Sequence, residues 1–425
     1  MAQLNDGQRK AFVETLQFLN DPNRKHHSVS GGAGVGKTFF ISKVADDILK
    51  HTDADVRLKH VAITATTNKA AAVLQEAMPH KIGDIGTVYT LMNLRVHSNF
   101  STGEQSLTPT RNWAVHTNTL IIVDEASMVS RSLWEYIDKG TSSNCKILFV
   151  GDKNQLAPVK ETLSPVYASA MSESLLNVPV RNAEQPALME LCEQAKQTVL
   201  TGKFTPIKEV PGVIDFLEGS SMQGLLEREY RQEDPTKRVL CYTNKRVLEY
   251  NSFIREIRGY TKAVEVGEVL TNNQSAELVT KERLYTDQMV KVVSIDREYM
   301  NESLIADVGI PMLDMTVECI TYGVHYEVSV FEDFADRAEA LKYFSTRKKW
   351  HQYFKIRDNY PDLRSVAAST THKAQGSTYQ SVIVDLADIG KSTNKEQTAR
   401  MQYVALSRPK SRLFIRGKLP ERYFK

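Results

Sequence analysis

The chain has 425 residues, enough for about two to four domains, and its 41% apolar and 25% charged content is ordinary for a globular protein. Its net charge of only +3 excludes a uniformly basic coat for nucleic acid, so any such surface must be local. The four cysteines lack metal-ligand spacing and indicate reduced thiols. We read neither a signal peptide nor an apolar run long enough to cross a membrane. We therefore expect a cytoplasmic protein with no membrane partner.

The most informative run in chain order covers residues 31–38, between a short strand pattern and a helical pattern. It reads Gly-Gly-Ala-Gly-Val-Gly-Lys-Thr, which fits the spacing of a P-loop. Such glycines let backbone N–H groups converge on phosphate oxygens at a helix N-terminus. Lys37 would reach the β- and γ-phosphates and the Thr38 hydroxyl would ligate Mg²⁺. A glycine-rich turn without a ligand is the alternative. The predicted cradle for ATP consists of Gly32, Ala33, Gly34, Val35, Gly36, Lys37 and Thr38.

Short apolar runs at residues 61–65, 120–123 and 146–150 are each followed by polar turns and helical patterning. This alternation predicts an α/β fold with a doubly wound parallel sheet. A polar stretch at about residues 93–113, with Ser-Thr-Gly between two β-like runs, predicts a small hairpin insertion.

Asp124 and Glu125 come directly after the apolar run at 120–123. Acidic residues at the carboxyl end of a parallel strand lie where ligands bind. Asp124 would hold Mg²⁺, and Glu125 would polarise the attacking water. A solvated acidic pair in a turn is the alternative. After the next strand, Gln155 would sense the γ-phosphate with its amide donor and acceptor.

A second α/β pattern begins near residue 176, with a strand at 238–242 and a helix at 245–257. Short alternating strands between 262 and 335 indicate a β-rich insertion, and the α/β pattern returns at 365. The predicted division is 1–85 and 115–175 for the first lobe, 86–114 for its insertion, 176–261 and 363–425 for the second lobe, and 262–362 for the second insertion.

Two arginines outside the first α/β core are candidates to neutralise the charge that develops on the γ-phosphate. Arg181 follows Val-Pro-Val, and Arg408 lies in the phrase Tyr-Val-Ala-Leu-Ser-Arg-Pro-Lys. If both come from a second lobe, ATP lies in a cleft whose opening and closing follow hydrolysis. A structural salt bridge is the alternative for either arginine.

Assembled in order, these motifs resemble those of superfamily 1 DNA helicases of the RecD-like, 5′-to-3′ branch (superfamily 1B). Asp6 to Phe12 resembles the Q motif, so Gln8 would read the adenine. The remaining matches are motif I at 31–38, Ia at 66–71, II at 124–128, III at 151–159, IV at Arg181, a second-lobe phrase at 242–245, V at 370–377 and VI at 403–410. The resemblance covers nearly the whole chain.

This resemblance implies two RecA-like lobes with ATP between them and single-stranded DNA across their tops. It also implies a pin-bearing insertion in the first lobe and an SH3-like insertion in the second. Gln375 and Gly376 of motif V would help to bind the nucleotide. The residues implied as DNA contacts are Thr66, Thr67, Lys69, Thr87, Phe100, Thr370, Thr371 and His372.

Some of these assignments have alternatives. Tyr89 stands two residues after Thr87 where relatives usually have histidine, and Ser407 and Pro409 replace the usual threonine and alanine. His372 is equally well a structural histidine. Phe100 would be the strand-separating wedge, or would pack against the neighbouring insertion. The basic and aromatic segment 343–360 would bind single strands, although its helical stripe favours core packing.

We expect an ATP-dependent 5′-to-3′ DNA helicase that acts on single-stranded DNA and on single-strand/duplex junctions. A single-stranded-DNA-binding protein or other replisome proteins are possible partners, and a phage origin would place the protein in host cytoplasm. One alternative is a DNA-stimulated ATPase that translocates or remodels protein–DNA complexes with little unwinding. Another is a P-loop scaffold without turnover, against which Lys37, Glu125, Gln155 and Arg408 argue.

Overall fold

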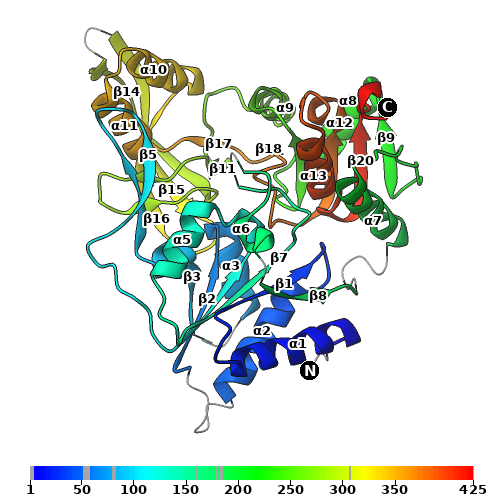
Figure 1. The fold of residues 1–425 in the computed structure, drawn as a ribbon. Helices are drawn as coiled ribbons and strands as arrows, with labels where there is room; N and C mark the ends of the chain where they lie inside the picture. Colours follow the sequence, from blue (N-terminus) through cyan, green and yellow to red (C-terminus); the bar gives the residue numbers. More distant parts are fainter. Residues whose placement is uncertain are drawn as a thin grey trace.

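Two parallel α/β lobes stand side by side, and an antiparallel β module lies beside them (Figure 1). The computed structural model describes residues 4–50, 58–78, 83–158, 161–169, 171–178, 180, 185–305 and 308–424. Within these ranges, none of the helices combines the length and apolar character that crossing a bilayer would require.

The first lobe is built on a parallel sheet in the order β3-β2-β6-β7-β1-β8. Its strands are β1 (His26–Gly31), β2 (His60–Ala65), β3 (Asp84–Thr87), β6 (Thr119–Asp124), β7 (Lys146–Gly151) and β8 (Ser172–Leu176). One face is covered by α1 (Asp6–Asn20), α2 (Lys37–Lys50) and α3 (Asn68–Ala77). The other is covered by α4 (Val88–Leu91), α5 (Arg131–Lys139) and α6 (Pro165–Ala168). Because helices bury both faces, the central strands are almost wholly apolar.

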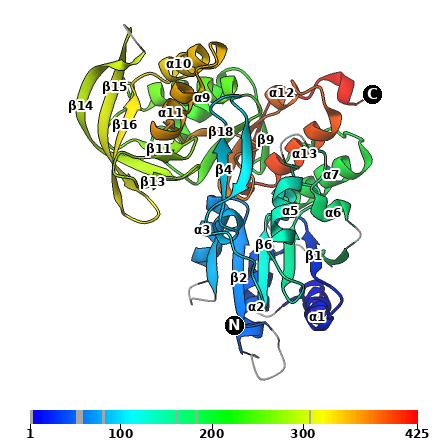
Figure 2. The same ribbon diagram turned by 60° about the vertical axis from the view of Figure 1, so that its left-hand side comes forward.

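Two irregularities of this lobe matter for the site. A short 3₁₀ turn, η1 (Ala126–Met128), follows β6. Between α4 and β6, the antiparallel hairpin β4 (Leu94–Ser98) and β5 (Gln105–Pro109) leaves the lobe, and Figure 2 shows it rising towards the β module. The hairpin lies within the insertion predicted at 86–114.

The second lobe repeats the architecture with a parallel sheet in the order β18-β10-β19-β20-β9. Its strands are β9 (Ile214–Leu217), β10 (Lys237–Cys241), β18 (Ala368–Thr370), β19 (Tyr379–Asp385) and β20 (Pro409–Arg416). One face packs on α7 (Pro186–Thr201), α12 (Leu386–Ile389) and α13 (Lys395–Leu406), and the other on α8 (Ser220–Glu229) and α9 (Asn244–Ile257). The turn η2 (Glu421–Tyr423) follows β20. The doubly wound α/β prediction is confirmed for both lobes.

The β module interrupts the second lobe. Its sheet has the order β16-β15-β14-β11-β17, with strands β11 (Val269–Asn272), β14 (Met289–Ile305), β15 (Val308–Cys319), β16 (His325–Phe331) and β17 (Leu363–Ser365). A small ribbon of β12 (Ala276–Glu277) and β13 (Arg283–Leu284) lies beside it. The helices α10 (Phe334–Thr346) and α11 (Trp350–Asn359) form an arm that packs on the long β14–β15 hairpin (Figure 2).

The observed pairings bear on two predicted boundaries. Leu176 pairs with Gly31, so β8 closes the first sheet just where the second lobe was expected to begin. The strand β17 pairs with β11 of the β module, so the second lobe resumes at β18 rather than at residue 363. The SH3-like character of the module stays a prediction.

Candidate nucleotide site and nucleic-acid track

The glycine-rich run forms a loop between β1 and α2 in the first lobe. Gly34 and Gly36 have φ angles of 78° and 80°, which favour glycine because a Cβ crowds the left-handed backbone. The Lys37 ammonium donates to the carbonyl oxygens of Gly31 and Gly32 at 2.9 and 3.0 Å. The loop thus has the shape of a phosphate cradle at a helix N-terminus, and Lys37 lies folded over it.

Gln8 is tied to this loop. Its amide nitrogen donates to the carbonyl of Val35 at 3.0 Å, and its amide oxygen accepts from the Asn5 backbone at 3.1 Å. The second bond belongs to a capping box that begins α1, since the Asn5 side chain accepts from the Gln8 backbone. Gln8 therefore fixes α1 against the loop, and reading an adenine would require exchange of one of these bonds.

The acidic pair lies at the carboxyl end of β6. Asp124 is buried and accepts from the backbone N–H of Glu125 at 2.8 Å. Glu125 has a φ of 52°, a conformation that turns its side chain out of the strand direction. Burial, and then the neighbouring Glu125 charge, raise the pKa of Asp124 well above its usual range. One carboxyl oxygen of Glu125, Oε2, is buried without a hydrogen-bond partner in the described structure.

A divalent cation beside Asp124 would offset the effects that raise the pKa of this carboxyl. Asp124 offers a buried anionic oxygen beside the P-loop, and a cation there would favour its ionised form. Thr38 lies in the first turn of α2, directly after Lys37, and its hydroxyl is the second predicted ligand. The donors fit Mg²⁺, which keeps several waters and takes only one or two protein oxygens.

The loop after β7 carries the predicted sensor. Gln155 is buried, and its amide nitrogen lies 3.4 Å from the Asp152 carboxylate. Its amide oxygen has no partner in the described structure, so it remains free to accept a hydrogen bond from a water or ligand.

Motif V of the second lobe lies against the acidic pair Asp124 and Glu125 of the first lobe. Gln375 donates to the Ser127 hydroxyl at 3.0 Å, across the two lobes. Gly376, with a φ of 75°, lies so close that a Cβ there would be 3.5 Å from the Glu125 carboxylate. The structure thus brings Gln375 and Gly376, which the resemblance implies as nucleotide contacts, together with the acidic pair.

Arg408 is placed in the second lobe but turned inward. Its guanidinium is buried and donates to the carbonyl oxygens of Val404 and Ser377 at 2.9 and 3.0 Å. It lies behind the 375–377 loop, with no described contact to the first lobe. Arg181 lies outside the described residues.

Of the predicted DNA contacts in the first lobe, two threonines bond to the backbone of their own lobe, and Lys69 lies near the second lobe. The Thr66 hydroxyl donates to the Glu125 carbonyl at 3.4 Å, and Thr67 caps α3 by accepting from Ala70. Lys69 reaches the second lobe, where its ammonium lies 5.8 Å from the Tyr379 ring. Thr66 therefore links the predicted DNA track to the backbone of Glu125, while Thr67 supports the start of α3.

Tyr379 is the centre of a cationic cluster that no sequence motif indicates. The Arg238 guanidinium also lies over its ring, 5.0 Å from the ring centre. Burial alone would raise the pKa of Tyr379, but the charges of Arg238 and Lys69 outweigh it and lower the pKa to about 8.

In the second lobe, the three predicted track residues differ in exposure. Thr371 is fully buried, and its hydroxyl donates to the Cys241 carbonyl at 3.1 Å, so the structure gives it a supporting role rather than a phosphate contact. Thr370 accepts from the Lys373 backbone. His372 is half-buried near Tyr242, and burial lowers its pKa, which favours the uncharged ring.

The hairpin tip docks on the arm. Phe100 is 56% exposed, and its ring makes an edge contact with Phe354 at 5.4 Å and lies 5.9 Å from His351. A Cβ at Gly103 would lie 2.5 Å from the Trp350 ring, so the tip fits closely. Thr87 caps α4 at the base of the hairpin by accepting from Thr90. The Phe100 ring thus packs on the arm with one edge, while more than half of the residue stays exposed to solvent.

The aromatic stripe at 343–360 is not one helix. Lys348, with a φ of 54°, breaks it into α10 and α11. Phe344 and Phe354 are buried, and Tyr343 and Tyr353 pack beside them in the arm. Core packing is therefore the main role of these rings.

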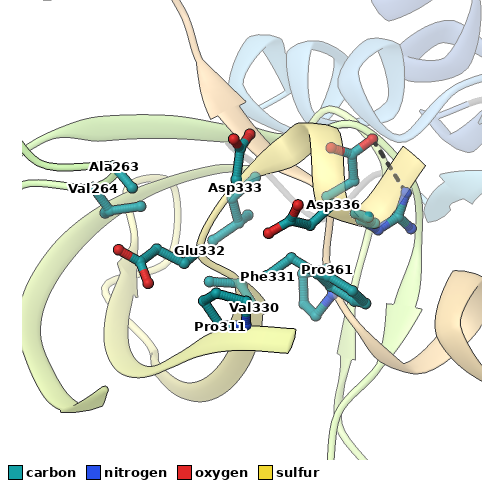
Figure 3. Close-up of a pocket in the computed structure, with 12 residues that line it drawn as sticks. Ala263, Val264, Pro311, Val330, Phe331, Glu332, Asp333, Asp336 and Pro361 are labelled. Atoms are coloured by element: carbon teal, nitrogen blue, oxygen red, sulfur yellow. Dashed lines mark ion pairs between the residues drawn. The ribbon is translucent and has the colours of Figure 1, made fainter. Parts of the chain in front are cut away.

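A separate cavity of about 550 Å³ lies in the β module, away from the P-loop. Figure 3 shows the carboxylates of Glu332, Asp333 and Asp336 around it and the ion pair of Arg337 with Asp362, 3.7 Å long. Because four of its five charged lining residues are acidic, this cavity disfavours nucleotide phosphates. The candidate nucleotide site is therefore the edge between the lobes.

Two residues of α13 were missed by the sequence reading. Tyr403 donates to Asp152, and Arg400 donates to backbone carbonyls of the same loop. Tyr403 is the first residue of motif VI at 403–410, but only the three-dimensional contact reveals its partner.

Two family models match the chain. The AAA domain model covers residues 18–161, within the first lobe, and the UvrD-like helicase C-terminal domain model covers 365–415, within the second. Together they cover the segments that carry the P-loop, the acidic pair and motifs V and VI.

Full-length relatives include a helicase. The chain is 23% identical to the ATP-dependent DNA helicase dda of Enterobacteria phage T4, over 88% of this chain and 90% of that protein. An uncharacterized protein of Acanthamoeba polyphaga mimivirus is 22% identical over 96% and 99%. A shorter match, 35% identical over 32% of this chain and 30% of the relative, is to the ATP-dependent DNA helicase Pif1 of Campylobacter jejuni.

Solved structures share the fold. A structure of two coordinating Pif1 helicases at forked duplex DNA has a TM-score of 0.55 at 14% identity. Bacteroides Pif1 in complex with ADP-AlF3 and single-stranded DNA has a TM-score of 0.52 at 13% identity. Each alignment covers 100% of this chain and 94% of the other.

The fold and the site together define a two-lobed P-loop protein whose nucleotide edge is shared between lobes. More narrowly, the chain matches models of the AAA domain and of the UvrD-like helicase C-terminal domain, and it is similar to the helicases Dda and Pif1.

Proposed function

We propose that this protein is an ATP-dependent DNA helicase that moves 5′ to 3′ on single-stranded DNA and unwinds duplex ahead of it. One observation carries the proposal: the buried Glu125 carboxylate of the first lobe faces Gly376 of the second. Hydrolysis at an edge shared by two lobes changes their relative position, which is how such a protein converts ATP into movement. The names of its relatives, an ATP-dependent DNA helicase and a single-strand-bound Pif1, support DNA as the track.

In this proposal the P-loop N–H groups and Lys37 bind the phosphates, and Gln8 lies beside the adenine. Lys37 would exchange the carbonyls of Gly31 and Gly32 for phosphate oxygens. Asp124 and Thr38 would hold Mg²⁺, which supplies neutralisation of phosphate charge. The residues that line the cradle are Gly32, Ala33, Gly34, Val35 and Gly36.

Glu125 and Gln155 act on the attacking water. The unpartnered Oε2 of Glu125 would accept the water's proton, and the free amide oxygen of Gln155 would orient it. Arg408 would turn from the Ser377 carbonyl towards the γ-phosphate when the lobes close, and Arg181 would act with it.

In this proposal, single-stranded DNA runs over the tops of both lobes. Lys69 and Thr370 are the candidates for phosphate contact, while Thr66, Thr67 and Thr371 support the surface from beneath. Thr87 positions the base of the hairpin. Phe100, held by the arm and still half-exposed, would part the strands at a junction.

The anchored hairpin favours unwinding over the alternative of a translocase with little strand separation, because a wedge must be rigid to split base pairs. A role in phage DNA replication or recombination, beside a single-stranded-DNA-binding protein, would fit the T4 and mimivirus relatives.

The test is steady-state ATP turnover without nucleic acid, with single-stranded DNA, and with RNA of the same sequence. We expect strong stimulation by DNA. ATP turnover that DNA does not stimulate would contradict the proposed function. Equal stimulation by RNA would contradict the claim that the protein is specific for DNA.

A further inference from the structure

The helix α13 of the second lobe touches the first lobe through two side chains one turn apart. Residues three positions apart lie on the same face of a helix. Arg400 Nη1 donates to the carbonyl oxygen of Lys153 at 2.7 Å and to that of Gln155 at 2.8 Å. One guanidinium therefore holds the backbone of the sensor loop on both sides of residue 154.

Tyr403 completes the contact. Its hydroxyl donates to the Asp152 carboxylate at 2.6 Å and accepts from the backbone N–H of Ala33 at 3.0 Å. Tyr403 and Asp152 are only 2% and 1% exposed, so water does not replace a lost partner. A single phenol thus joins α13 to the P-loop and to the loop that carries Gln155.

The other end of α13 leads to Arg408. The helix ends at Leu406, and the Arg408 side chain donates back to the carbonyl of Val404. A helix is a stiff element, so a shift of the sensor loop at Arg400 and Tyr403 is carried along α13 to Arg408.

We propose that Arg400 and Tyr403 are positioning residues that couple the 152–155 loop to Arg408. This inference rests on the proposed function and deepens it. The described contacts of both side chains are with protein groups of the P-loop and of the 152–155 loop, so we class them as positioning residues. Their loss should slow the step that needs Gln155 and Arg408 together, while the phosphate cradle still binds ATP.

The experiment compares Tyr403→Phe with Tyr423→Phe in the full chain. Both remove a buried phenol hydroxyl of the second lobe, but the Tyr423 hydroxyl bonds only to residues of its own lobe, at Thr398 and Ser392 among others. Turnover is measured at saturating single-stranded DNA over a range of ATP concentrations, and melting temperature is measured alongside. Arg400→Lys is a second test variant, because lysine keeps the charge but lacks the planar fork that spans two carbonyls.

We expect kcat to fall about tenfold in Tyr403→Phe and in Arg400→Lys, with the ATP KM changed less than about twofold. The Tyr423→Phe control should lower the melting temperature without changing kcat. Unchanged kcat in folded Tyr403→Phe, or in Arg400→Lys if the first variant does not fold, would overturn the inference. Equal kcat loss in Tyr423→Phe would also overturn it. Absence of DNA-stimulated turnover in the unsubstituted chain would instead overturn the proposed function.

Discussion

The Gln375 amide and the Ser127 hydroxyl form a 3.0 Å hydrogen bond that joins the two lobes beside the acidic pair. One partner follows Glu125 in the first lobe, and the other precedes Gly376 in the second. This bond can therefore form only when the two lobes are close together at the candidate nucleotide site.

Replacing Gln375 by alanine should lower DNA-stimulated ATP turnover by up to about tenfold, since a neutral hydrogen bond contributes about 0.5–1.5 kcal/mol. Gln380→Ala is the matched control, because its amide bonds to Ser411 within the second lobe. Steady-state kinetics of the two variants make the comparison. Equal losses in both would mean that the contact between the lobes has no special part in turnover.

Lys37→Ala should reduce ATP turnover by about 10²–10³, the loss seen when one donor to a developing charge is removed. The fold should survive, because Lys37 contacts only backbone carbonyls of its own loop in the described structure. Circular dichroism checks the fold and phosphate release checks turnover. The control is Lys43→Ala, further along the same helix α2, whose ammonium lies over the Phe39 ring. Persistent turnover in Lys37→Ala would show that the nucleotide site has been placed wrongly.

Phe100→Ala should slow unwinding about tenfold, because it removes the exposed ring and its edge contact with Phe354. ATP turnover stimulated by single-stranded DNA should stay within about twofold, since the hairpin lies outside the nucleotide edge. Phe424→Ala, at a ring 45% exposed near the end of the described chain, is the control. A parallel loss of turnover and unwinding would argue against a wedge.

Tyr379 should ionise near pH 8, below the ordinary value of 10.0. Because the phenolate is favoured in the folded chain, folded Tyr379 loses its proton first, and the stability that it contributes develops between pH 8 and 10 and vanishes below pH 8. Phenolate absorbance over this range should show one early-titrating group that Tyr379→Phe removes. Lys69→Ala should move the transition to higher pH. An unchanged titration curve in Tyr379→Phe would refute the assignment.

Local spacing explains what could be predicted from the sequence. The P-loop glycines and the acidic pair lie within a few residues of the strands that position them, so their pattern alone predicts the lobe and its edge. The apolar runs of β2, β6 and β7 predict buried parallel strands because helices cover both faces.

The rest depends on contacts between distant residues. Tyr403 and Asp152 are 251 positions apart, and no local pattern marks their hydrogen bond. Threonine serves equally as a phosphate ligand, a helix cap or a buried donor, so the sequence could not separate half-buried Thr370 from fully buried Thr371. The inward turn of Arg408 depends on the Ser377 carbonyl, which comes from another strand connection.

The most direct measurement is ATP-driven unwinding of two matched partial duplexes, one with a 5′ single-stranded tail and one with a 3′ tail. The account predicts unwinding from the 5′ tail only, with hydrolysis stimulated by the same DNA. Unwinding from the 3′ tail alone would contradict the direction of movement. Stimulated hydrolysis without unwinding of either duplex would contradict the helicase account and favour a translocase that does not separate strands.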